Sequence, residues 1–93
     1  RGEASLADQL RRAGDSVVLN LAEGAGRFAP REKARFYEIA LGSGAECGAA
    51  LDLCAIRGLA SRAAIARARG LLGEVQRMLN ALTRAARRRA ASA

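Results

Sequence analysis

The chain has 93 residues, which allows one domain, and 51% of them are apolar. Ala supplies 23 of the 47 apolar residues, so large side chains for a core are few. A single Pro and abundant Ala, Leu, Arg and Glu favour helices and exclude a β-sandwich, a collagen-like chain and a disulfide scaffold. A chain this short buries only about 60–65% of the surface that it exposes when unfolded. We therefore expect another subunit or a further segment to cover part of its apolar surface.

The formal net charge of +7 is concentrated in the last third of the chain. Residues 1–56 carry seven basic and eight acidic residues, whereas residues 57–93 carry nine Arg and one acidic residue, Glu74. Arg makes up 15 of the 16 basic residues, and its guanidinium group suits phosphate. A GC-rich genome also explains Arg in place of Lys, but it does not explain why the charge is segregated.

The residue types exclude several kinds of site. His is absent, which removes the commonest metal ligand and the commonest general base. Cys47 and Cys54 are seven residues apart, or about 10.5 Å along a helix, which is beyond the reach of a disulfide bond. We expect two buried thiols in a reducing cytosol, no metal and no cofactor. With no run of about 18 apolar residues and no signal-peptide pattern, we also expect a cytoplasmic protein without a membrane partner.

Apolar spacing predicts a first helix over residues 6–23. Ser5 and Asp8 resemble a capping box and place the start of this helix after Ser5. Gly24 is expected to end it in a left-handed conformation. The apolar row consists of Leu6, Leu10, Ala13, Val17 and Leu21.

A second helix is expected over residues 30–57, with Pro30 in its first turn. Two parallel apolar rows make its apolar surface wide, so it needs cover on more than one side. Gly42, Gly44 and Gly48 would each cost about 1 kcal/mol relative to Ala. They indicate either a neighbour packed very close to the helix or a break near Gly42. The two rows are Phe36, Ala40, Ser43, Cys47, Ala50 and Cys54, and Tyr37, Leu41, Gly44, Gly48, Leu51 and Ala55.

The most regular apolar row predicts a third helix over residues 62–89. Gly58 is expected to end the second helix and Ser61 to cap the third. The row consists of Ile65, Ala68, Leu72, Val75, Leu79, Leu82 and Ala86. On the polar side of the helix lies a set of basic residues that we call the arginine stripe: Arg62, Arg69, Arg77, Arg84, Arg87, Arg88 and Arg89.

Four polar residues are expected near the junction of the first two helices: Asn20, Glu23, Arg27 and Glu46. Such groups fix the register of a bundle when they form a buried hydrogen-bonded network. The alternative is a catalytic carboxylate pair of Glu23 and Glu46. Since no nucleophile, His or metal-ligand set accompanies them, we expect a structural network and no enzyme.

Several of these residues form a pattern that resembles the four-helix-bundle proteins known as 23S rRNA intervening-sequence proteins. The resemblance rests on Asp8–Ala13, Ser16, Asn20–Arg27, Glu32, Phe36, Ile39–Ser43, Glu46 and Met78–Leu82. Two positions depart from the pattern, Ala29 in place of a Ser helix cap and Lys33 in place of an apolar aromatic residue. The resemblance implies a bundle whose first helix is missing from this chain and which assembles into a ring, often a pentamer. The family also includes the accessory variability determinant of diversity-generating retroelements, which works with a reverse transcriptase and RNA.

Together these observations predict one all-α domain over residues 1–93, an up-and-down antiparallel bundle that forms a homo-oligomeric ring. The first hypothesis is a non-enzymatic protein that binds nucleic acid, structured RNA above all, or an RNA-associated partner such as a reverse transcriptase. The arginine stripe would neutralise phosphates, and without a platform of aromatic residues we expect recognition by shape and charge. The second hypothesis is a protein-only assembly module whose stripe is a solvated face. Neither hypothesis involves a small-molecule substrate.

Overall fold

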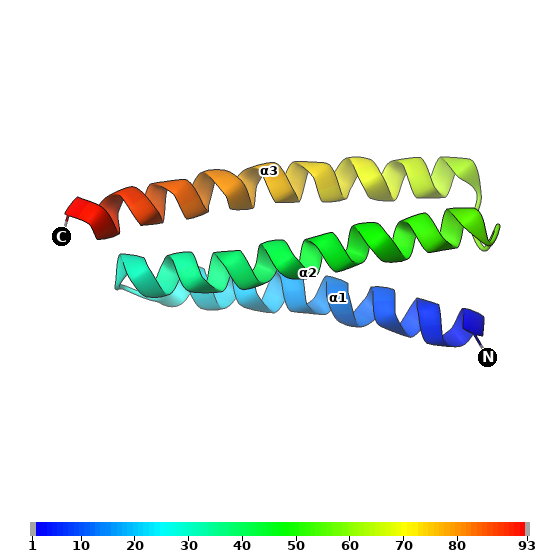
Figure 1. Ribbon diagram of the computed structural model, residues 1–93, viewed down its shortest axis with the longest axis horizontal. Helices are drawn as coiled ribbons and strands as arrows, with labels where there is room; N and C mark the ends of the chain where they lie inside the picture. The colour runs from blue at the N-terminus through cyan, green and yellow to red at the C-terminus, as the bar shows by residue number, and fades with distance from the viewer. Residues whose placement is uncertain (1, 93) are drawn as a thin grey trace.

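The computed structural model describes residues 2–92, with side chains from Ser5 onward. In that range the fold belongs to the all-α class, with helices joined by short turns. The helices are α1 (Gly2–Gly26), α2 (Pro30–Ile56) and α3 (Arg62–Ser92). They run antiparallel in an up-and-down order, as Figure 1 shows, and form a body of 49 × 22 × 15 Å. The all-α class is confirmed, whereas the four-helix bundle and the ring stay predictions.

The central helix is α2, which packs against both α1 and α3, while α1 and α3 scarcely meet. Two clusters of buried side chains lie along it, and most of their members belong to the apolar rows seen in the sequence. One cluster consists of Ala13, Val17, Tyr37, Ala40, Cys47 and Leu79, and the other of Leu6, Ala50, Leu51, Cys54 and Ile65. This arrangement explains why α2 needs two apolar rows and its neighbours only one.

The turn between α2 and α3 is closed by the signals that the sequence predicts. Gly58 has a φ of +65°, and its N–H donates to the Ala55 carbonyl at 3.2 Å. The Leu59 N–H donates to the Cys54 carbonyl at 2.9 Å, which completes a Schellman motif. Ser61 Oγ then accepts a hydrogen bond from the Ala64 N–H at 3.1 Å and caps α3. Pro30 stands in the first turn of α2, also as expected.

Both expected ends of the first helix are wrong. Helix α1 already includes Ser5, and the Asp8 carboxylate accepts hydrogen bonds from Arg12 and Arg11 one turn later instead of capping a helix start. These guanidinium groups, Arg12 first, hold the pKa of Asp8 below its usual value. Gly24 lies inside α1, which continues to Gly26 and has no left-handed residue among those described.

The reason for glycine at position 24 is close packing. A Cβ atom there would lie 2.6 Å from Cε1 of Tyr37 and 3.2 Å from the Lys33 carbonyl oxygen. The Tyr37 ring is buried in the main cluster, so it has little room to move. Gly24 therefore permits α1 and α2 to approach at this level.

Helix α2 is unbroken through its three glycines, so the break near Gly42 is not found. The expectation of a close neighbour holds at Gly44, where a Cβ atom would overlap the amide group of Gln76 on α3. At Gly48 the nearest atom would be Cδ2 of Leu72 at 3.7 Å, an ordinary contact, and Gly42 has open space within 4 Å. One of the three glycines thus serves close helix packing.

Helix α2 is also long and apolar enough, by length and composition alone, to cross a membrane. Its mean hydropathy reaches 1.4 over an 18-residue window, of which 39% is buried. The central helix of a soluble bundle passes the same test, so this is weak evidence for a span. The expectation of no membrane partner stays a prediction. Cys47 and Cys54 lie on this helix as free, buried thiols.

Candidate nucleic-acid interface

All seven residues of the arginine stripe are exposed on α3. From Arg62 to Arg89 the stripe extends over about 40 Å at the helical rise. Because each residue turns the helix by about 100°, Arg77, Arg84 and Arg88 share one line, within about 40° of one another. The side chain of Arg89 leaves the helix about 100° away from that of Arg88. Arg62, Arg69 and Arg87 form a second line about 70° away around the helix, so the stripe consists of two adjacent lines with Arg89 turned aside.

Two arginines of the stripe are paired with carboxylates of α2. Arg69 Nη2 lies 2.7 Å from Asp52 Oδ1, and Arg87 Nε donates to Glu38 Oε2 at 3.1 Å. The hydrogen bond to Glu38 raises the pKa of Arg87, because it stabilises the charged form of the guanidinium group. These ion pairs connect α3 to α2 and neutralise part of the stripe. Exposed pairs of this kind contribute little to stability because solvent screens them.

Five arginines of the stripe have no such partner. Among the side chains that the structure describes, no carboxylate lies within ion-pair distance of any of them, and they are Arg62, Arg77, Arg84, Arg88 and Arg89. Their charge is therefore balanced by solvent ions, which a bound polyanion can displace.

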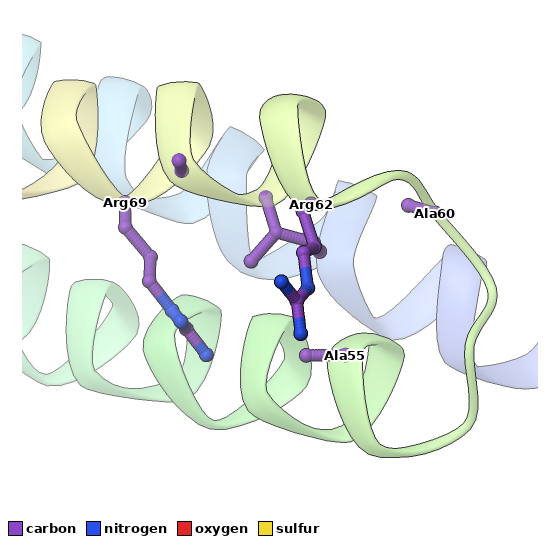
Figure 2. A pocket seen from close by; sticks show the side chains of 6 residues that line it. Ala55, Ala60, Arg62 and Arg69 are labelled. Carbon is purple, nitrogen blue, oxygen red and sulfur yellow. The ribbon is translucent and has the colours of Figure 1, made fainter.

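The two ends of the stripe differ in shape. At the start of α3, Figure 2 shows Arg62 and Arg69 extending from α3 toward α2. They border a hollow of about 270 Å³ with an apolar floor that includes Ala55 and Ile65. At the other end, a wider hollow of about 440 Å³ lies between the end of α3 and the start of α2. It is lined by Pro30, Arg88, Arg89 and Ser92.

The four polar residues expected at the helix junction do not form one network in the described part of the chain. Arg27 pairs with Glu23 at 3.0 Å and with Glu32 across the turn at 3.3 Å. Asn20 instead donates to the Ser16 carbonyl oxygen, at 2.9 Å.

Glu46 is separated from this group by the antiparallel packing. It is exposed and lies 16 residues after the start of α2, or about 24 Å along the helix. At that level α2 faces the middle of α1, and Glu46 borders a small hollow together with Gln9. Glu23 and Glu46 are thus too far apart to act as a carboxylate pair.

A polar layer that sequence reasoning missed lies deeper in the bundle. Ser16 Oγ of α1 and Ser43 Oγ of α2 are 2.6 Å apart, and Asn20 Nδ2 donates to Ser16 Oγ at 3.1 Å. Ser43 stands in an apolar row of the second helix. A buried hydroxyl group needs a hydrogen-bond partner, so its presence in that row could have indicated a polar residue on a neighbouring helix. This layer joins α1 to α2 by a hydrogen bond within their packed interface.

The protein-family model described as 23S rRNA-intervening sequence protein matches residues 2–81. The chain belongs to this family. Comparison with curated proteins gives no significant match, and neither does comparison with solved structures. The resemblance that Asp8–Ala13 and Asn20–Arg27 indicate in the sequence is thereby confirmed.

The family match ends before the last part of the arginine stripe. Arg62, Arg69 and Arg77 lie inside the matched residues, and Arg84 and the cluster from Arg87 to Arg89 lie beyond them. Among the side chains of residues 5–92, no group of three or more Cys, Asp or Glu is placed to hold a metal ion. Of the five unpaired arginines, Arg62 and Arg77 thus lie inside the family match, and Arg84, Arg88 and Arg89 lie beyond it.

Proposed function

We propose that this protein is a non-enzymatic, homo-oligomeric helical bundle that binds structured RNA through the arginine stripe of α3. The observation that carries the proposal is the imbalance on α3, where five guanidinium groups face solvent without a carboxylate among the described side chains. Each guanidinium group that neutralises a phosphate releases cations condensed on the nucleic acid, and this release favours binding. The family description, which names an intervening sequence of 23S rRNA, supports RNA over DNA.

The spacing of the line formed by Arg77, Arg84 and Arg88 supports contact with several phosphates. The first two are about 10.5 Å apart along the helix and the last two about 6 Å. Double-stranded RNA is recognised chiefly through its shape, phosphates and 2′-hydroxyl groups, which a straight basic helix can follow.

Exposed apolar side chains support self-association. Leu71 and Met78 lie seven residues apart on one face of α3, 65% and 45% exposed, and Ile56 at the end of α2 is 79% exposed. Apolar surface left open on every helix of a small chain is typical of a protein that buries it against further subunits. Further exposed members are Val18, Leu19, Ile39 and Leu53.

The test compares two double variants that remove the same charge from the same helix. Arg77→Gln with Arg84→Gln removes two unpaired groups, and Arg69→Gln with Arg87→Gln removes the two groups engaged with α2. Binding to a structured RNA is measured by fluorescence anisotropy over a range of KCl concentrations. We expect the first variant to flatten the log–log salt slope by about 1.5, since each phosphate contact contributes about 0.7–0.9, and the second to change it much less. An unchanged slope in the first variant would refute the proposal.

The second candidate function, a protein-only assembly module, is favoured by the exposed apolar side chains alone. Its signature is a defined native mass that nuclease treatment leaves unchanged, together with RNA binding that is absent at every salt concentration. Analytical ultracentrifugation of treated and untreated protein separates the two functions.

A further inference from the structure

Phe28 is the most exposed large apolar side chain in the described part of the chain. It is 95% exposed and lies in the turn between α1 and α2. A single exposed apolar residue is ordinary in a folded protein, so its exposure alone indicates no function. Its surroundings are what distinguish it.

The turn that carries Phe28 lies at the same end of the molecule as the C-terminal end of α3 (Figure 1). Phe28 precedes Pro30 by two residues, so no more than about 7 Å of chain separates them. Pro30 borders the wider hollow together with Arg88 and Arg89. The turn that carries the exposed Phe28 ring therefore adjoins the hollow that Arg88 and Arg89 line.

Other cations near the turn are already occupied with a different ring. The Arg27 guanidinium lies 4.9 Å from the centre of the Phe36 ring, and that of Arg35 lies 5.8 Å from it. Phe36 is half-buried under these groups, whereas the ring of Phe28 is open to solvent. Of the two rings, Phe28 is the one that can accept a flat partner.

We propose that Phe28 is a stacking platform for an unpaired nucleobase, and that Arg88 and Arg89 hold the adjacent phosphate. An unpaired nucleotide fits this site because it joins a flat aromatic ring to an anion at short range, and stacking on aromatic side chains accepts any base. The inference rests on the proposed function and adds to it a preference among RNA structures. The protein prefers RNA with an unpaired loop, bulge or single-stranded end to a continuous duplex, in addition to the recognition by shape and charge that the sequence predicts.

The test uses two RNAs with equal numbers of phosphates, a hairpin with an unpaired loop and a blunt duplex. We expect Phe28→Ala to weaken hairpin binding by about 5-fold to 100-fold, as the loss of one stacked base predicts, and to leave duplex binding and both salt slopes unchanged. Phe28→Trp restores hairpin binding. Because the chain contains no other Trp, quenching of its fluorescence by the hairpin and not by the duplex reports stacking directly.

Circular dichroism and native mass first establish that both variants fold and assemble as the wild type does, as expected for a side chain in solvent. If wild-type protein binds the hairpin but Phe28→Ala binds it equally well and the Trp emission is unaltered, the inference is wrong and the proposed function stands. If the wild type binds neither RNA, the proposed function itself fails. A changed native mass with both RNAs weakened alike would make Phe28 a contact between protein subunits and would also refute the stacking role.

Discussion

Gly44 of α2 and Gln76 of α3 are in direct contact, with the amide group of Gln76 in the space that a side chain at position 44 would fill. The Gln76 Nε2 donates to the Leu41 carbonyl oxygen at 3.0 Å, which fixes the amide over the glycine. Its Oε1 is buried without a partner among the described residues. A long polar side chain thus reaches across the helix interface and relies on a glycine for its space.

This contact predicts opposite effects at two glycines of one helix. Gly42→Ala should raise the free energy of unfolding by about 1 kcal/mol, because Ala favours the helix and the site has open space. Gly44→Ala should gain the same helix propensity but displace Gln76 from Leu41, at a cost of about 1–3 kcal/mol, so that the net effect is a loss of about 1 kcal/mol. Urea denaturation at one fixed protein concentration measures both. Equal stabilisation by the two variants would contradict the contact.

The packing of Tyr37 on Gly24 predicts a similar contrast within α1. Gly24→Ala forces a methyl group against a buried ring and should lower the free energy of unfolding by about 1–3 kcal/mol. Gly14→Ala, where nothing lies within 4 Å of the added atom, should raise it by about 1 kcal/mol. Thermal and urea unfolding followed by circular dichroism provide the comparison. A Gly24→Ala variant as stable as the wild type would show that the Tyr37 ring can move aside and that the packing does not require glycine at this position.

The ion pair of Glu38 with Arg87 predicts that removing an acid strengthens RNA binding. Glu38→Gln leaves Arg87 without its carboxylate, and the freed guanidinium should add about 0.7–0.9 to the magnitude of the salt slope if it reaches a phosphate. Glu74→Gln is the matched control, since it removes the same charge from an exposed residue of α3 that has no ion pair among the described side chains. A similar increase in both variants would show that only the net charge matters.

Burial predicts a slow reaction of Cys47 with thiol reagents. Desolvation, with a smaller contribution from the Glu46 carboxylate, raises the pKa of the Cys47 thiol above its usual value. In a Cys54→Ala variant, Cys47 is the only thiol. Its alkylation should be slower in the folded protein than in the protein unfolded by urea. In the folded protein the rate should rise with pH only above the pH at which a free thiol ionises. The stabilisation from the neutral thiol is complete below its ordinary pKa and is lost as the pH rises through the raised value. Alkylation at the rate of a free thiol would show that the α1–α2 interface is open.

The three helices were predictable because their signals are local. The spacing of Ile65, Leu72 and Leu79 depends only on the helical period, and the caps at Gly58 and Ser61 depend only on neighbouring residues. The same locality explains the errors at α1. A glycine near the end of a helical pattern is compatible both with a left-handed cap and with close packing, and at Gly24 the difference lies in Tyr37, 13 residues away.

The amino-acid sequence was sufficient to establish the helical class, the apolar rows and the concentration of positive charge on the last helix. Each of these follows from periodicity or composition within a short stretch of the chain. Which arginines are engaged with Asp52 and Glu38, why Gly44 must lack a side chain and that Glu46 stands apart from Glu23 became apparent only once the helices were packed. These features depend on the relative rotation and register of helices that are distant in the chain. Many weak contacts set that register together, and no single motif encodes it.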